Sequence, residues 1–92
     1  MNNFDFLKSP TDISMDLVKR VRMRRKEKKI TQEQLSRLAG VSYGSIKRFE
    51  QTGEISLSSL IKIAFILGAE DDFYELFSKK GYTSIQEVID EQ

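Results

Sequence analysis

The twenty residues from Thr31 to Glu50 constrain the fold of this chain more than any other stretch. Thr31 followed three residues later by Gln34 is the pattern of a capping box, which starts a helix. Gly40 then supplies a residue that tolerates positive φ where this helix has to end. Ser42 is a second N-cap residue. The stretch therefore predicts two short helices joined by a tight turn.

Each of these two helices has an apolar face at helical spacing. The apolar residues are Leu35, Leu38 and Ala39 in the first helix, Val41 at the corner, and Ile46 and Phe49 in the second. The other face of the second helix has two cations, small or hydrogen-bonding groups and no carboxylate: Tyr43, Gly44, Ser45, Lys47 and Arg48. A helix that reads the DNA major groove must present a narrow, polar, acid-free face of this kind. An ordinary helical hairpin with a solvated outer face is the alternative.

The order and spacing of many residues resemble the Cro/repressor-type (XRE) helix-turn-helix family of bacterial and phage regulators. The matching residues are Arg25, Thr31, Gln32, Leu35, Ala39, Gly40, Val41, Ser42, Ile46, Arg48, Glu50, Gly53, Ser56, Leu57, Leu60, Lys62, Ile63, Ala64, Leu67 and Gly68. The match covers about residues 17–68, more than half of the chain. The resemblance implies an all-α, five-helix, lambda-repressor-like DNA-binding domain, to which this chain adds a short C-terminal helix.

Three positions depart from the family pattern. Ser36 stands where alanine is usual, which is a mild change. Lys29 replaces the usual glycine before Thr31, so we expect the first long helix to end under strain or one residue later. Ile55 replaces a proline, so we expect the loop before Ser56 to be less fixed.

The resemblance also implies roles for individual residues. Tyr43, Gly44, Ser45, Lys47 and Arg48 are expected to face the bases, and Thr31, Gln32, Ser42 and Arg22 are expected to contact phosphates. Arg25 and Glu50 are expected to form a partly buried ion pair that joins the first helix to the recognition helix. The alternative for Arg25 is a cation that faces the DNA backbone.

Charge is strongly segregated along the chain, although the net charge is only +1. Residues 17–48 contain eleven Lys and Arg against two acids, a local net charge of +9, whereas residues 49–92 have a net charge of −6. A run of charge is usually only a solvated face. Because this one coincides with a groove-reading motif, it is more typical of a surface that binds phosphates.

The chain divides into an N-terminal arm (residues 1–10), a helix-turn-helix DNA-binding domain (11–77) and a C-terminal tail with a short helix (78–92). Ser9 as N-cap and Pro10 at the first helical position mark the start of the first long helix, whose apolar stripe includes Ile13. The arm contains Phe4, Phe6 and Leu7. These residues either cover the core of their own domain or contact a second subunit.

Two further helices are expected after the recognition helix. The first, from residues 57 to 67, is apolar on nearly all sides, so it is either central or shared with a partner. The second is expected from about Asp71 to Phe77, with Asp71 and Asp72 at the positive end of its dipole rather than as metal ligands. In the tail, Thr83 and Gln86 form another capping box pattern.

Several functional classes are excluded by composition. The chain has no His and no Cys, so it lacks an imidazole acid or base, a thiolate nucleophile and a disulfide. No Gly-rich phosphate loop or paired carboxylates in a cleft are evident, and we expect neither an enzyme nor a metal or cofactor site. No apolar run approaches 18 residues and no signal peptide pattern opens the chain, so we expect a soluble cytoplasmic protein. RNA-binding signatures are also missing.

A finer resemblance lies downstream and is to HipB-like antitoxins, the regulators encoded beside HipA-type kinase toxins. It rests on the run from Ser45 to Leu60, the residues 71–77 and the tail from Tyr82 to Val88. This resemblance implies an autoregulator that binds operator DNA as a homodimer and also binds a HipA-type kinase. A plain repressor without a toxin partner is the second hypothesis. The alternative outside DNA binding is a protein–protein interaction module of the same fold. The expected dimer or partner residues are Phe73, Tyr74, Phe77, Ile85, Val88 and Ile89.

Overall fold

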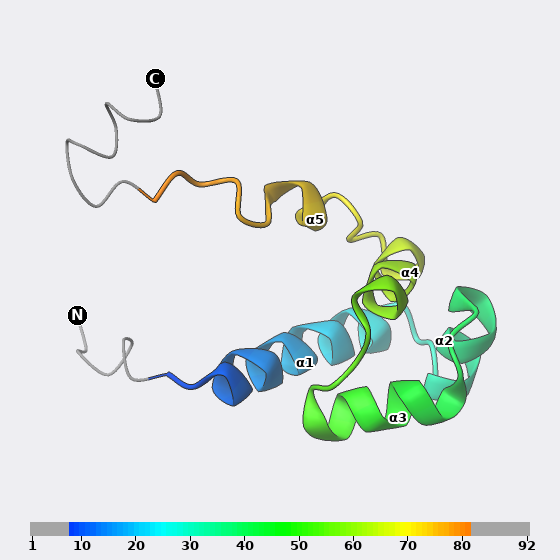
Figure 1. Ribbon diagram of the computed structural model, residues 1–92. Helices are drawn as coiled ribbons and strands as arrows, with labels where there is room; N and C mark the ends of the chain where they lie inside the picture. The colour runs from blue at the N-terminus through cyan, green and yellow to red at the C-terminus, as the bar shows by residue number, and fades with distance from the viewer. Residues whose placement is uncertain (1–7, 82–92) are drawn as a thin grey trace.

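Hydroxyl side chains set where four of the five helices begin. In the computed structural model, which describes residues 8–81, the hydroxyl oxygens of Ser9, Thr31, Ser42 and Ser56 each accept a hydrogen bond from the backbone N–H three residues later. Such caps satisfy N–H groups that have no partner within the helix. The helices are α1 (Pro10–Glu27), α2 (Gln32–Ala39), α3 (Tyr43–Thr52), α4 (Leu57–Leu67) and α5 (Asp72–Glu75) (Figure 1). The described part of the chain contains no strand, which confirms the all-α, five-helix prediction.

Two backbone positions shape how the helices connect. Gly53, with φ of +80°, ends α3 where the chain passes close to α1, and a Cβ at this position would lie 2.8 Å from the Cβ of Ser14. Glycine is therefore required there for both conformation and space. Lys29, after α1, has φ of +58°, in the left-handed region that costs a side-chain-bearing residue roughly 1–2 kcal/mol. This is the strain expected from the replacement of glycine.

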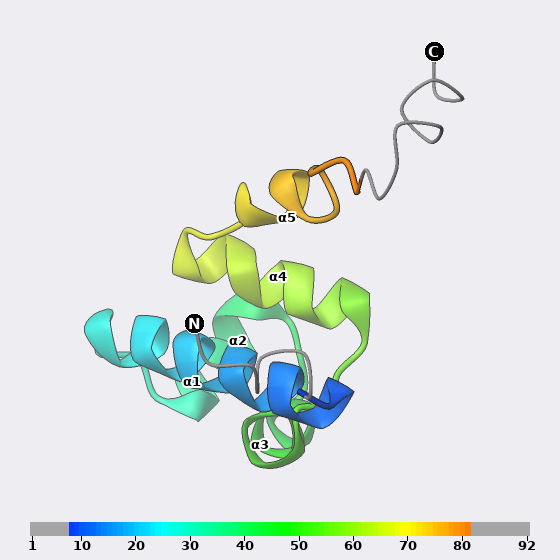
Figure 2. The ribbon, with the colours of Figure 1, turned by 90° about the vertical axis from the view of Figure 1, so that its left-hand side faces the viewer.

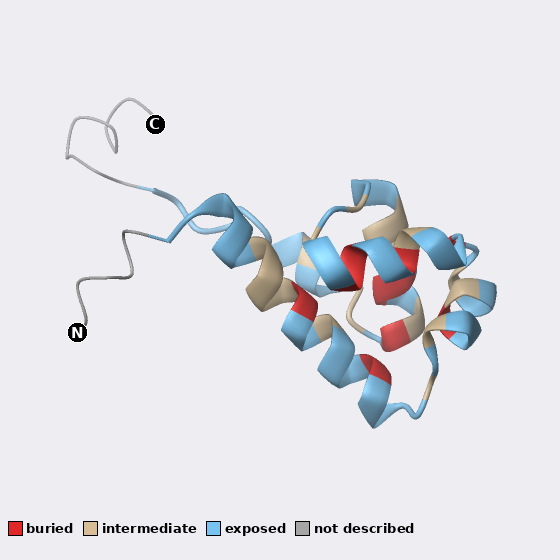
Figure 3. Cartoon of the chain, turned by 90° about the horizontal axis from the view of Figure 1, so that it is seen from below, coloured by how far each residue is buried: buried red, intermediate tan, exposed pale blue. Residues whose placement is uncertain are grey.

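The core lies between α2, α3 and α4, with α1 closing one side. Leu35, Val41, Ile46, Ile63 and Leu67 form its central cluster. α2 packs on α3 and α4, and α1 packs on α3. Figure 3 shows that the buried positions lie on the inward sides of the helices, while the outer sides are exposed. α5 lies on the opposite side of α4 from α3 (Figures 1 and 2).

Some residues of the predicted apolar stripes are exposed rather than buried in the core. Leu38 is 58% exposed, because α2 turns Leu35 and Ala39 toward the core instead. Ile13 is also largely exposed, because at the start of α1 it is Ser14 that faces the neighbouring turn at Gly53.

The last described helix is shorter than the sequence predicted. α5 spans Asp72–Glu75 rather than residues 71–77. Its N-cap residue, Asp71, makes no side-chain cap, Leu76 is extended, and Phe77 has φ of +60°. A single uncapped turn has little stability of its own, which explains why the helix does not continue to Phe77. The tail residues 82–92, with the predicted short helix, and the arm residues 1–7 lie outside the described residues.

One side of α4 is left bare. Ile63, Ala64 and Leu67 are buried, whereas Leu57 and Phe65 are more than half exposed. Although α4 contributes to the core, residues 8–81 do not surround it, contrary to one of the two expectations from its apolar composition. Within residues 8–81, no helix has both the length and the hydropathy needed to cross a membrane.

Candidate nucleic-acid interface

The outward side of α3 holds the five residues expected to face the bases. Tyr43, Gly44, Lys47 and Arg48 are exposed and Ser45 is half-buried. The Nζ atom of Lys47 lies 5.2 Å from the centre of the Tyr43 ring, a cation–π contact that holds both side chains at the start of the helix. None of these residues is acidic, so this side of α3 offers hydrogen-bond donors and positive charge.

Arg48 belongs to a small polar network at the other end of α3. Its guanidinium pairs with the carboxylate of Glu54 at 2.5 Å. Thr52 donates its hydroxyl hydrogen to the Arg48 carbonyl and accepts a hydrogen bond from the Glu54 backbone N–H. Glu54 was not foreseen as a neighbour of the recognition surface, because only the turn at Gly53 brings it back toward Arg48.

The residues expected to contact phosphates lie around the N-termini of α2 and α3. Thr31 and Ser42 are exposed N-cap residues, and each hydroxyl already accepts a backbone hydrogen bond. Arg22 extends from α1 with about half of its side chain exposed, and its Nε lies 3.5 Å from Glu50. Arg22 and the positive end of the α2 dipole lie together near Glu50. The positive end of the α3 dipole, at Ser42, is a separate site about 12 Å away along α3.

Gln32 is half-buried and its side chain has a partner within the protein. Its Nε2 donates a hydrogen bond of 2.9 Å to an oxygen of Glu50. An amide nitrogen has two hydrogens, so this bond orients Gln32 and leaves one donor for another acceptor.

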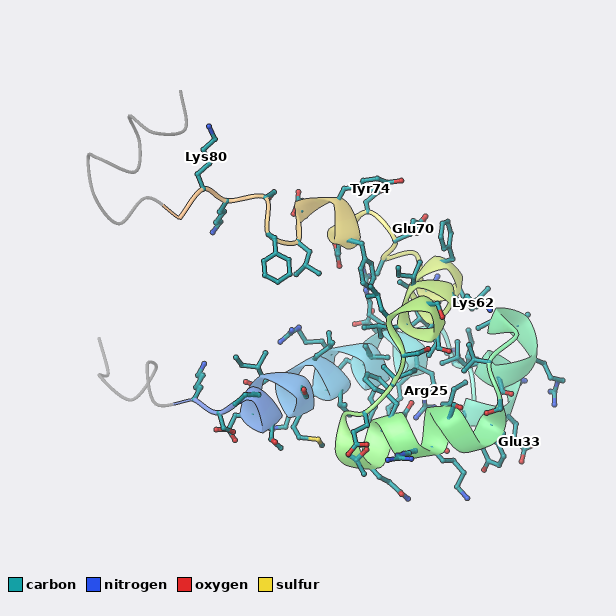
Figure 4. The ribbon with its side chains drawn as sticks, in the orientation of Figure 1. Arg25, Glu33, Lys62, Glu70, Tyr74 and Lys80 are labelled. Atoms are coloured by element: carbon teal, nitrogen blue, oxygen red, sulfur yellow. The ribbon has the colours of Figure 1, made fainter. Side chains whose placement is uncertain are left out.

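Arg25, which lies between α1 and α3 (Figure 4), forms a buried ion pair with Glu50 of α3 in which two of its nitrogens contact the two carboxylate oxygens. The Arg25 guanidinium donates to the two Glu50 oxygens over 2.8 Å and 2.9 Å, and it also donates to the carbonyl of Ile30 over 2.9 Å. Fork-to-fork contacts of this kind fix orientation as well as contributing energy. The pair thereby sets the position of the recognition helix relative to α1.

The pKa of Glu50 reflects the balance of forces at this pair. Burial opposes ionisation and on its own would raise the pKa of the Glu50 carboxyl. Hydrogen bonds from Arg25 and Gln32, together with the charges of Arg25 and Arg22, outweigh burial, so the pKa lies below its usual value. Glu50 is therefore ionised at neutral pH and acts as the hub of this cluster.

One polar contact in the turn itself was missed by sequence reasoning. The hydroxyl of Ser36 donates a 2.6 Å hydrogen bond to the carbonyl of Val41, across the turn between α2 and α3. The only signal for it was that serine stands where the family has alanine. The substitution therefore adds a bond that fixes the angle between the two helices.

The basic charge of residues 17–48 is solvent-accessible. Ten of its eleven Lys and Arg residues are exposed, and Arg25 is the buried one. In residues 8–81, no cluster of three or more His, Cys, Asp or Glu side chains is arranged to hold a metal ion. The chemistry that this surface offers is the binding of anions and of hydrogen-bond acceptors.

The expected partner residues lie away from α3, on and after α5. Tyr74 is 85% exposed and points away from α1 (Figure 4), Phe77 is 94% exposed, and Phe73 is half-buried. Ile85, Val88 and Ile89 in the tail, and Phe4 and Phe6 in the arm, lie outside the described residues.

Comparison with known proteins agrees with the geometry of α2 and α3. A family model described as helix-turn-helix matches residues 21–72, from the second half of α1 to the start of α5. The comparison with curated proteins found no match, and neither did the comparison with solved structures. The matched segment includes the capped α2, the turn at Gly40 and the acid-free side of α3. The chain belongs to the XRE-type helix-turn-helix family and is a DNA-binding transcription regulator.

Proposed function

We propose that the protein is a sequence-specific repressor that binds an operator as a homodimer, in the cytoplasm, and regulates its own gene. The observation that carries this proposal is the exposed, acid-free side of α3. It lies on a helix whose opposite side is fixed by the buried Arg25–Glu50 pair. A rigid helix with exposed donors is what direct reading of base edges in the major groove requires.

Arg48 is the residue proposed to give most of the specificity. Two nitrogens of a guanidinium can bond the O6 and N7 atoms of one guanine at the same time. In the free protein Arg48 is held by Glu54, but both side chains are about two-thirds exposed, at 67% and 64%. Exposed pairs of this kind contribute about 0–1 kcal/mol, so exchanging Glu54 for a guanine costs little. Tyr43, Gly44, Ser45 and Lys47 are proposed to contact neighbouring bases.

Contacts to phosphates are proposed for Thr31, Gln32, Ser42 and Arg22. The free hydrogen on Gln32 is already aimed by its bond to Glu50. The N-termini of α2 and α3 add backbone N–H groups and positive dipole ends. These contacts fix the register of the protein on the duplex but do not read sequence.

Selection of binding sites from random duplexes, followed by footprinting, tests this function. We expect a roughly palindromic site, since one recognition helix reads only a few base pairs and a dimer reads two half-sites. With ~6–8 phosphate contacts for a dimer, the plot of log K against log salt concentration should have a slope of about −5 to −7. No selected sequence and a slope near zero would favour the alternative, an interaction module of the same fold.

The exposed aromatic residues after α4 favour a second candidate function, the binding of a protein partner. Tyr74 and Phe77 are both almost fully exposed, and aromatic side chains are enriched at the surfaces where proteins bind one another. With the resemblance to HipB-like antitoxins, they support a HipA-type kinase toxin as the partner. Co-expression with such a kinase encoded by a neighbouring gene tests this. We expect a stable complex that Tyr74→Ser with Phe77→Ser weakens, and no complex with either form would remove this candidate.

A further inference from the structure

An apolar groove lies between α1, α4 and α5, remote from the recognition side of α3. It encloses about 410 Å³, and its apolar lining includes Leu17, Val21, Leu57, Leu60, Phe73 and Leu76. Leu57 is 63% exposed and Leu76 is 56% exposed, so the residues of the described chain do not cover it. A mainly apolar groove of this volume is a candidate binding site.

The edge of the groove is positively charged on the α1 side. Arg20 and Arg24 line it, and both are exposed. They are four residues apart on one helix, so their side chains emerge on the same face. Neither takes part in the ion pairs formed among residues 8–81. Asp72 of α5 also lines the groove. Two cations against one acid leave its lining with a net positive charge, so the groove fits an apolar segment that carries a net negative charge.

The C-terminal segment of this chain, residues 83–91, has that composition. Ile85, Val88 and Ile89 recur at helical spacing, so in a helix they would form one apolar stripe. In the same helix the acids Glu87, Asp90 and Glu91 would lie on the other face, so the segment has one apolar side and one acidic side.

We propose that the groove is the docking site for residues 83–91 of a second copy of this chain, with Ile85, Val88 and Ile89 in the groove and the net negative charge of the segment attracted by Arg20 and Arg24 at its edge. The inference rests on the homodimer of the proposed function and assigns its contact. Exchange between two copies is favoured by the course of the chain: from α5 to the last described residues it runs away from α4 (Figure 1). A segment that docked in its own groove would have to reverse direction after Gly81, whereas docking in a second copy requires no such reversal.

The first test measures dimerisation by sedimentation equilibrium at micromolar concentration. We expect the full-length chain to dimerise, and expect Leu57→Glu, Val88→Glu and a chain ending at Gly81 each to raise the dimer dissociation constant by at least about tenfold, a change of 1.4 kcal/mol. Leu38→Glu is the matched control, because Leu38 is an equally exposed leucine on another helix, outside the groove. Circular dichroism checks that each variant is folded. A chain ending at Gly81 that dimerises as tightly as the full-length chain overturns the proposal.

The second test separates exchange between copies from docking within one copy. Leu57→Glu and Val88→Glu are mixed, each with a different tag. In a mixed dimer the intact tail of the Leu57→Glu chain can dock in the intact groove of the Val88→Glu chain, so one of the two contacts survives. We therefore expect more mixed dimer than homodimer of either variant. If mixing restores no dimer, docking between copies is wrong. Selection of DNA sites with the full-length chain is carried out in parallel. If the groove variants still dimerise but the full-length chain selects an operator, only the docking proposal is wrong. If the full-length chain selects no operator, the proposed function itself is wrong.

Discussion

Replacing Arg25 by alanine should destabilise the protein far more than replacing any other cation of α1. Arg25 donates three hydrogen bonds, two to Glu50 and one to the carbonyl of Ile30, and it is 8% exposed. Its removal leaves the Glu50 carboxylate buried with only Gln32 and the more distant Arg22 as partners. The buried Glu50 carboxylate without its arginine partner accounts for most of the expected loss of stability.

The expected loss follows from these contacts. Breaking one half of a buried pair costs about 3–5 kcal/mol, against a total stability of roughly 5–14 kcal/mol for a chain of this length. For a domain of this size, each kcal/mol lowers the melting temperature by about 4–8 °C. Arg25→Ala should therefore lower it by at least about 12 °C.

Urea denaturation followed by circular dichroism measures this loss directly. Lys26→Ala is the control, because Lys26 is the adjacent, exposed cation, and such changes usually stay within about 0.5 kcal/mol. The double variant Arg25→Met with Glu50→Leu should lose less than the sum of the two single changes, since no charge is left unpaired. An Arg25→Ala variant as stable as Lys26→Ala would refute the view that this pair holds α1 against α3.

Three further outcomes follow from single positions. The pKa of the Glu50 carboxyl is lower in the folded protein than in the unfolded chain. The ionised carboxylate therefore stabilises the fold fully above the unfolded-state pKa, and this stabilisation is lost as the pH falls through the folded-state pKa. The free energy of unfolding, measured from pH 6 to pH 2, should show this loss, and its pH dependence should be weaker in Glu50→Gln. Gly53→Ala should destabilise the protein, because the new Cβ would clash with Ser14 and because the backbone there has positive φ. Gly44→Ala should stabilise it by about 0.5–1 kcal/mol, because Gly44 is helical and a Cβ there would meet open space. Equal melting temperatures for the two variants would contradict this prediction. Lys29→Gly should raise stability by up to about 1 kcal/mol. Glycine removes the cost of the left-handed conformation, and this gain exceeds the cost of the extra conformational freedom that glycine gives the unfolded chain. A loss of stability would show that Lys29 is not strained.

The sequence predicted the local structure well, because capping and turn signals are local. The N-caps Ser9, Thr31, Ser42 and Ser56 each start a helix, as expected. The extent of α5 could not be predicted in this way. The spacing of its apolar residues fits a longer helix, but nothing caps Asp72–Glu75 and Phe77 turns out of helical conformation.

Contacts between distant residues were predictable only where the family pattern supplied them. Arg25 and Glu50 were paired by resemblance, and the structure adds the bonds from Gln32 and to Ile30. The Arg48–Glu54 pair depends on the course of the chain after Gly53. Burial of apolar residues was overestimated at Leu38 for a similar reason, since periodicity shows which residues share a face but not how far the neighbouring helices cover it.

The central claim, that α3 reads DNA sequence through its exposed side, is tested most directly at Arg48. Its affinity contribution is measured by titrating Arg48→Ala against the selected operator and against random duplex at the same salt concentration. A bidentate guanine contact is worth about 1–3 kcal/mol, so we predict a loss of about 5- to 150-fold on the operator and a much smaller loss on random DNA. An equal loss on both duplexes, or no loss on the operator, would contradict the claim that Arg48 reads a base.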